Sequence, residues 1–280
     1  MMAFSGFSNR FLSIARRFST SSSCKGYNNL TTMKNDIKGV RKITMSNPKK
    51  RNALSYQMME DLIDDIALGD DDPSLRCIVI AAEGHVFSAG HDLKELSQSG
   101  MPEKVFEMCS SLMAAIRNSP VPIISVVNGL AAAAGCQLAA ASDIVVCSEK
   151  SSFSTPGGNF GLFCSTPGVA LVRVVPRQFA NLMLYTGEPI SAQQALQTGL
   201  VAKVCEESQL DEEVIKIANA IMLKPRDVVA LGKRFLNQQV EMDVISAFRL
   251  GEKVMVQNLE YANAQEGLTS FIEKRKPKWK

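Results

Sequence analysis

Two segments rich in glycine and alanine place backbone N–H groups where a ligand could reach them. Residues 123–143 (IISVVNGLAAAAGCQLAAASD) join an apolar run of strand length to a series of very small side chains. Val86–Glu95 (VFSAGHDLKE) follows the apolar run Cys77–Ala82 and leads into a charged helix start. The first N–H groups of a helix lack intrahelical partners, so they can stabilise an oxygen that becomes negative during a reaction. An alanine-rich helix packed tightly against a sheet explains the first segment equally well.

Side chains near these segments offer acid–base or nucleophilic chemistry. His91 follows His85 closely and precedes Asp92. No third nitrogen or thiolate ligand has the spacing that a zinc site needs, so we expect no metal site. Cys164 is a candidate nucleophile for a thioesterase reaction, although no base is evident near it in the sequence.

The amino-terminal 35 residues contain no Asp or Glu, whereas Arg10, Arg16 and Arg17 stand among many serines. This composition is typical of a mitochondrial transit peptide, because the arginines interrupt every apolar run before it reaches the about seven residues of a secretory signal core. A disordered basic tail is the alternative. We expect residues 1–24 to be a transit peptide, cleaved near Ser19–Lys25 on import into the mitochondrial matrix.

The charge of the mature chain bears on its partners. Removing residues 1–24 takes away three arginines and no acid, so the formal net charge falls from +3 to 0. A neutral chain argues against a nucleic-acid partner. No run approaches the roughly 18 apolar residues of a membrane-spanning helix, so we expect no membrane insertion. The seven cysteines form no CxxC pair, which is typical of free thiols in a reducing compartment.

The elements that would position these groups alternate between strands and helices. We expect strands over Gly39–Met45, Leu75–Ala82 and Ile123–Val127, with helices that begin at Ser55 and at Pro102. Such alternation predicts a largely parallel or mixed sheet covered by helices. From about Glu206 only helical patterns remain, and we expect helices over Glu207–Leu223, Pro225–Gln238 and Val244–Asn263.

Several separated motifs resemble, in the same order, those of the enoyl-CoA hydratase/isomerase family, the crotonase superfamily. Besides the two small-residue segments, they are PKKRNALS at Pro48–Ser55, SSFSTPGGNFGLFCSTPG at Ser151–Gly168, TGEPISAQQALQTGLVAKV at Thr186–Val204 and EGLTSFIEKRKPKW near the carboxyl terminus. The resemblance implies an α/β fold, the crotonase spiral of repeated ββα units, over residues 25–205. It also implies a C-terminal helical trimerisation region over residues 206–280.

The resemblance also implies a homotrimer or a dimer of trimers. The C-terminal helices would present more apolar surface than one small core can cover. The apolar residues expected at that interface are Val228, Val229, Leu231, Phe235, Val254, Met255 and Leu259.

The family's ligand contacts carry over to named positions. In the family, two backbone N–H groups bind the thioester carbonyl oxygen of an acyl-CoA, and these map to His91 and Ala134. Ala134 replaces a usual glycine, which is harmless if its backbone is helical and harmful if its φ must be positive. The expected coenzyme A contacts are Lys49, Lys94, Phe271 and Lys274, the last two often across a subunit interface. No cofactor is implied apart from the coenzyme A thioester itself, as substrate or ligand.

The chain departs from the family at both acid–base positions. Hydratases use two glutamates, which align here with Gln137 and Gly157. A glutamine can form hydrogen bonds but has no basic form at neutral pH, and glycine has no side chain. The region Phe163–Thr166 also lacks an acid. We therefore expect very little hydration of crotonyl-CoA, and a partial return of activity when Gln137→Glu and Gly157→Glu are combined.

Three hypotheses follow. In the first, which we favour, the protein binds acyl-CoA in fatty-acid metabolism and has lost efficient hydratase chemistry. In the second, it is an active hydratase, isomerase, lyase or thioesterase-like enzyme that uses another proton carrier, such as His91, Cys164 or the substrate itself. In the third, it binds RNA, as one relative of the family does; the neutral charge and the absence of aromatic residues near the lysines argue against this.

Overall fold

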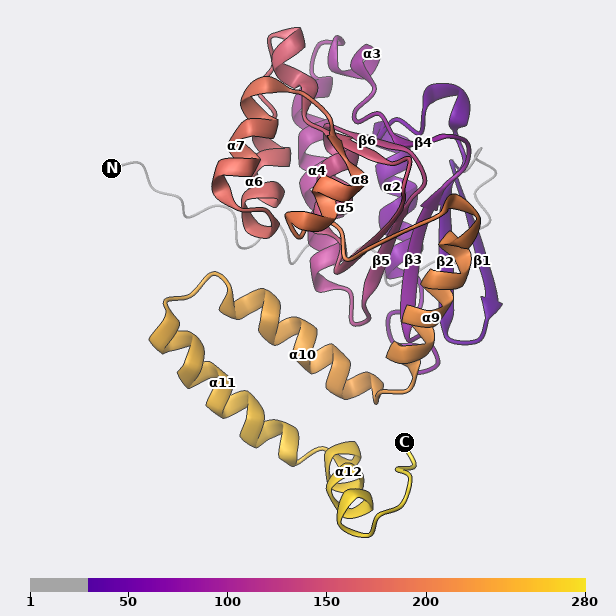
Figure 1. Ribbon diagram of the computed structural model, residues 1–280, viewed down its shortest axis with the longest axis vertical. Coiled ribbons are helices and arrows are strands. Elements are labelled where there is room, and N and C mark those ends of the chain that lie inside the picture. Colours follow the sequence, from indigo (N-terminus) through magenta and orange to yellow (C-terminus); the bar gives the residue numbers. More distant parts are fainter. Residues whose placement is uncertain (1–29) are drawn as a thin grey trace.

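The computed structural model describes residues 30–280, so the transit peptide expected over residues 1–24 lies outside the described residues (Figure 1). A six-stranded sheet has the strand order β1-β2-β3-β5-β7-β10. Strand β1 is antiparallel to β2, and every other pair in this sheet is parallel. The strands are β1 (Thr31–Ile37), β2 (Val40–Met45), β3 (Cys77–Ala82), β5 (Ile123–Val127), β7 (Ile144–Ser148) and β10 (Lys203–Cys205).

A second sheet of four short strands has the order β4-β6-β8-β9. Its strands are β4 (Val86–Ser88), β6 (Leu130–Ala132), β8 (Ser152–Ser154) and β9 (Ile190–Ser191). Each of the pairs β3/β4, β5/β6 and β7/β8 gives one strand to each sheet before the chain enters a helical segment. The spiral of ββα units expected from the sequence is therefore confirmed.

Helices cover the sheets. The amphipathic helix α2 (Tyr56–Ala67) begins as expected, because the Ser55 side chain accepts a hydrogen bond from the Met58 N–H. It buries Met58, Met59, Leu62 and Ile66 in the main core. The other helices up to residue 222 are α3 (Leu93–Leu96), α4 (Met101–Asn118), α5 (Ala134–Ala141), α6 (Ser165–Val174), α7 (Arg177–Thr186), α8 (Ala192–Gln197) and α9 (Leu210–Met222).

The alanine-rich run does not form one helix. Ala131 and Ala132 belong to β6, which pairs with β4 and β8, and α5 begins only at Ala134. Pairing with two neighbouring strands outweighs the helix propensity of alanine in this run. The helix start is therefore placed at the edge of the second sheet.

Three helices extend away from the sheets at the carboxyl terminus (Figure 1). They are α10 (Arg226–Gln239), α11 (Val244–Leu259) and α12 (Ala262–Ile272). The single helix expected over Val244–Asn263 is wrong, because Glu260 and an extended Tyr261 separate α11 from α12. Leu231 is buried against its own chain, whereas Met255 and Leu259 are exposed on α11, which buries no residue. None of the helices in residues 30–280 is long and apolar enough to cross a membrane.

Candidate active site

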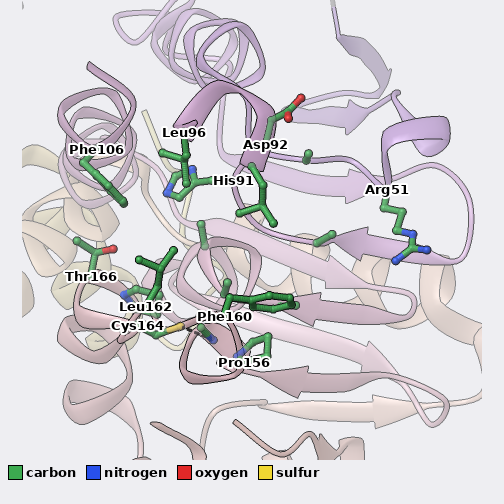
Figure 2. A pocket seen from close by; sticks show the side chains of 18 of the residues that line it. Arg51, His91, Asp92, Leu96, Phe106, Pro156, Phe160, Leu162, Cys164 and Thr166 are labelled. Atoms are coloured by element: carbon green, nitrogen blue, oxygen red, sulfur yellow. Dashed lines mark hydrogen bonds between the residues drawn. The ribbon is translucent and has the colours of Figure 1, made fainter. Parts of the chain in front are cut away.

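A cavity of about 780 Å³ opens beside the start of α5. The segment after β4, the loop before α6 and the first turn of α6 form its other walls (Figure 2). Its lining includes five residues singled out from the sequence, namely His91, Lys94, Ala134, Gly157 and Cys164. The fold thus brings together residues from three of the separated motifs.

Two backbone N–H groups are presented beside this cavity. Gly90 has a φ of +92°, and a Cβ atom built on it would lie 2.9 Å from the Ala133 Cβ and 3.2 Å from the Ala134 nitrogen. Only glycine lets the two backbone segments approach so closely. No backbone hydrogen bond within residues 30–280 uses the N–H of His91 or of Ala134. Both N–H groups are therefore available to a ligand.

Ala133 turns the chain into α5. It has a φ of 49° and a ψ of −117°, a conformation that strongly favours glycine. Its N–H donates to the Ser154 carbonyl at 2.9 Å, and its carbonyl accepts from the Gln137 N–H at 3.0 Å. Ala134 is the first residue of the helix, so alanine fits there in place of the family's usual glycine. The strained backbone conformation is that of Ala133.

The imidazole of His91 bonds through one ring nitrogen and leaves the other without a partner among the described residues. Its Nδ1 lies 3.0 Å from the Leu54 carbonyl oxygen, so Nδ1 carries the hydrogen and donates it. Nε2 is buried without a partner among the described residues. Burial lowers the pKa of His91, and Phe106 meets the ring edge-on at 5.4 Å. Among residues 30–280, no group of three or more His, Cys, Asp or Glu side chains is arranged to hold a metal.

Main chain occupies the space where a side chain at Gly157 would stand. A Cβ on Gly157 would lie 2.2 Å from the Leu162 carbonyl oxygen. The turn is closed by the Leu162 N–H, which donates to the Gly157 carbonyl at 2.9 Å. The Gly157 N–H donates to the Cys164 Sγ at 3.3 Å. A glutamate at Gly157 would therefore have to displace this loop, which argues against the expected return of hydration with Gly157→Glu.

Gln137 faces a different space. It does not line the cavity but a neighbouring cleft beneath α10, and it is 5% exposed. Its Oε1 has no partner among the described residues. Burial raises the pKa of Cys109 to about 11, against an opposing hydrogen bond from Gln137. The two positions that carry glutamates in hydratases thus lie in two adjoining spaces, and Thr166 lines both.

Cys164 is a poor nucleophile in this setting. Its side chain is buried, and that burial raises the pKa of its thiol, although the N–H of Gly157 opposes the shift. A raised pKa lowers the fraction of the reactive thiolate. Figure 2 shows Cys164 beside Leu162, on the opposite side of the cavity from His91.

The basic residues at the cavity differ partly from those expected. Lys94 lines the cavity on α3, and Lys50 and Arg51 line it as well, but Lys49 does not. Lys50 forms an ion pair with Asp92 at 3.0 Å, which lowers the pKa of that carboxyl group. Lys49 and Lys50 lie in the 3₁₀ turn Pro48–Lys50, and the geometry of this turn determines which of the two lines the cavity. The periodicity of apolar residues in the sequence does not predict this geometry.

Phe271 and Lys274 are not brought to the cavity. Phe271 lies on α12 and is 84% exposed, and neither residue lines the cavity. Figure 1 shows α12 at the opposite end of the molecule from α3. Within one chain these two residues form a separate surface.

An apolar wall was missed in the sequence. Leu96 and Phe106 lie on the His91 side of the cavity, and Phe160 and Leu162 face them (Figure 2). The FGLF sequence at residues 160–163 was the available signal, since exposed apolar residues in a loop mark a binding surface.

Comparison with known proteins shows what the chain is similar to. Residues 35–280 match the family described as Enoyl-CoA hydratase/isomerase. The human enoyl-CoA hydratase domain-containing protein 3, mitochondrial, is 54% identical over 89% of this chain and 83% of its own length. The protein of the same name from Xenopus laevis is 50% identical over 96% and 92%. These mitochondrial relatives confirm the mitochondrial localisation that the amino-terminal composition predicted.

Solved structures agree. The crystal structure of human enoyl Coenzyme A hydratase domain-containing protein 3 has a TM-score of 0.87 and 53% identity, and covers 89% of this chain and 100% of that chain. An enoyl-CoA hydratase from Mycobacterium smegmatis has a TM-score of 0.86 and 42% identity over 89% and 98%. The crotonase spiral expected from the motifs is confirmed, and the chain belongs to the enoyl-CoA hydratase/isomerase family.

Proposed function

We propose that the protein binds acyl-CoA thioesters in the cavity beside α5, in fatty-acid metabolism, and that it is not an efficient hydratase. The observation that carries the proposal is the pair of unused N–H groups of His91 and Ala134, held close by Gly90. The thioester carbonyl oxygen would accept a hydrogen bond from each. The amino-terminal end of α5 adds a partial positive charge near that oxygen.

The coenzyme A moiety would lie toward Lys50, Arg51 and Lys94. Basic side chains at the mouth of the cavity suit the phosphates of coenzyme A, and charge-assisted hydrogen bonds to phosphate are strong. Relatives named as enoyl-CoA hydratases support this class of ligand.

The cavity would lack the general acid and the general base that hydration needs. Asp92 is the only carboxylate among the described residues that line the cavity. One of its oxygens accepts from the Lys94 N–H at 2.9 Å and the other from Lys50 at 3.0 Å. These bonds lower the pKa of Asp92, so it is a weak base. Gly157 and Gln137 cannot replace it.

Two ligands that differ only at the carbonyl group test the proposed binding of the thioester. Calorimetry would compare butanoyl-CoA with S-butyl-CoA, in which a methylene replaces the carbonyl, on the mature protein. Two hydrogen bonds to the carbonyl should make the thioester bind about 10- to 30-fold more tightly. Equal affinities would show that the N–H pair binds no carbonyl, and no binding of either ligand would refute coenzyme A recognition altogether.

A second candidate is an active enzyme in which His91 carries the proton. It is favoured by the hydrogen bond from Nδ1 to Leu54, which leaves Nε2 as a basic nitrogen without a partner in the described chain. Exchange of the α-hydrogens of butanoyl-CoA in deuterated water, followed by NMR, would detect such proton transfer. His91→Phe keeps the backbone N–H and should abolish the exchange; undiminished exchange would remove His91 from this role.

A homotrimer or dimer of trimers also belongs to the proposal. Met255 and Leu259 expose apolar surface on α11, and assembly would cover it. A neighbouring chain would also bring Phe271 and Lys274 to a coenzyme A site that they do not reach within their own chain. Light scattering at micromolar concentration measures the mass, and a monomer would contradict the assembly.

A further inference from the structure

The cleft beneath α10 is a second apolar space of about 850 Å³. Helices α5 and α6 form walls of both spaces: Ala134 lines the first, and Gln137 and Ala141 line the second. At 1.5 Å per residue, α5 extends about 10 Å from Ala134 to Ala141. Thr166 on α6 lines both spaces, so the cleft and the cavity adjoin at this residue.

The roof of the cleft is fixed. Lys233 of α10 is 7% exposed, and its Nζ donates to the Ile116 carbonyl at 2.9 Å, to the Val121 carbonyl at 3.1 Å and to Asp143 at 2.7 Å. Every hydrogen of this ammonium group is therefore used. Because a buried ammonium is stable only with such partners, α10 is held over the cleft at a defined position.

The lining of the cleft indicates its occupant. Its charged rim residues pair with one another, since Glu241 contacts Arg173 at 3.2 Å and Arg117 at 3.5 Å. The walls between are mainly aliphatic. At the inner end, the buried Gln137 keeps an Oε1 without a partner among the described residues. A partner for this oxygen would have to be a water molecule or another polar group, so it is the aliphatic walls, and not Gln137, that indicate an apolar occupant.

We propose that this cleft is the distal half of the acyl-binding channel, and that the protein takes long-chain acyl thioesters. The inference rests on the proposed binding of acyl-CoA. With the carbonyl at His91 and Ala134, the chain passes Thr166 and continues between α5, α6 and α10. Each methylene buried there tightens binding about fourfold, which corresponds to about 0.8 kcal/mol.

Gly232 provides the test. It lies on α10 and lines the cleft, and a Cβ built on it meets no atom within 4 Å. Gly232→Phe therefore adds a large side chain to the wall of the cleft at a position where the Cβ has open space. Gln238→Phe is the matched control, because Gln238 is exposed on the same helix and does not line the cleft. Val169→Trp fills the cleft from an exposed position on α6 and is the second variant.

Calorimetry with butanoyl-CoA and hexadecanoyl-CoA on the mature protein separates the outcomes. The natural protein should bind hexadecanoyl-CoA at least about 250-fold more tightly, as burial of four methylenes in the cleft requires. Gly232→Phe and Val169→Trp should lose at least about 30-fold of that affinity and keep the affinity for butanoyl-CoA. Gln238→Phe should change neither.

Two results would refute the proposed channel but not the proposed binding of acyl-CoA. One is equal affinities of the natural protein for the two ligands, and the other is an unchanged affinity of both filled variants for hexadecanoyl-CoA. A change of oligomeric mass in the filled variants, without a change of affinity, would instead identify the cleft as a contact between copies. Failure of both ligands to bind the natural protein would refute the proposed function itself.

Discussion

The two walls of the cavity use their main chain in opposite ways. On the wall of His91 and Ala134, two backbone N–H groups have no backbone partner among the described residues, and we propose that they bind the ligand. On the wall of Gly157, the backbone bonds to its own loop and fills the space of a side chain. In the proposed function, binding of the thioester carbonyl depends on backbone N–H groups, which the spiral fold holds in place. Proton transfer depends on side chains, and a change in the sequence of one loop can remove a side chain. A member of this family can therefore lose the second and retain the first.

Hydration of crotonyl-CoA should show the largest consequence of this difference. General acid and base groups contribute about 10²- to 10⁴-fold each, so the natural protein should hydrate crotonyl-CoA at least about 10⁴-fold more slowly than a hydratase with both glutamates. The loss of crotonyl-CoA absorbance in a steady-state assay measures it. A rate near that of a working hydratase would show that His91 or an acid from a neighbouring subunit carries the proton.

Substituting alanine for two adjacent glycines of the loop, Gly157 and Gly158, tests how completely main-chain atoms fill the wall at Gly157. Gly157→Ala should lower the free energy of unfolding by about 3 kcal/mol, the upper end for overpacking, because its Cβ meets the Leu162 carbonyl. Gly158→Ala meets no atom within 4 Å and should stay within about 0.5 kcal/mol. Urea denaturation compares them, and equal effects would mean that the loop yields easily.

Substituting alanine for two glycines with positive φ, Gly90 and Gly100, tests the opposite wall, that of His91 and Ala134. Gly90→Ala would press its Cβ against Ala133, so the affinity for butanoyl-CoA should fall by about 10- to 30-fold as the N–H pair separates. Gly100 has a φ of +75° and open space around it. Gly100→Ala should therefore cost about 1 kcal/mol of stability and leave binding unchanged. Calorimetry and thermal unfolding distinguish the two, and equal binding by both variants would contradict the close approach at Gly90.

The smallest effect concerns the mouth of the cavity. Lys94→Ala should weaken coenzyme A binding about three- to fivefold at low salt and less at high salt, because the lost interaction is with a phosphate. Lys49→Ala should have no effect, since Lys49 does not line the cavity. Titrations at two salt concentrations measure both, and a loss at Lys49 equal to that at Lys94 would restore the sequence-based assignment.

Local patterns predicted much of the fold. The strand Ile123–Val127 has the predicted bounds, and the cap at Ser55 is present. The strand at Ala131 was missed, because its pairing with β4 and β8 depends on residues distant in sequence. Local hydrophobic and capping signals carry no information on such pairing.

The candidate site was predictable only where motifs determine the backbone. His91 and Ala134 could be placed because the segments that hold them are recognisable. Two other features have non-local causes, since Leu162 fills the space at Gly157 and the packing of α10 places Gln137 in a separate cleft. The surroundings of these positions follow from the folded chain rather than from their own sequence.

The hydrogen bonds of Lys233 also determine when the cleft can form. Their partners lie 90, 112 and 117 residues earlier in the chain. Helix α10 can therefore dock only after the end of α4 and the strands β5 and β7 are in place. We therefore expect docking of α10 to be a late step of folding. A chain that enters the mitochondrion amino terminus first would complete the wall of His91 and Ala134 before the roof of the cleft exists, and hydrogen exchange of α10 during refolding would lag behind that of α5.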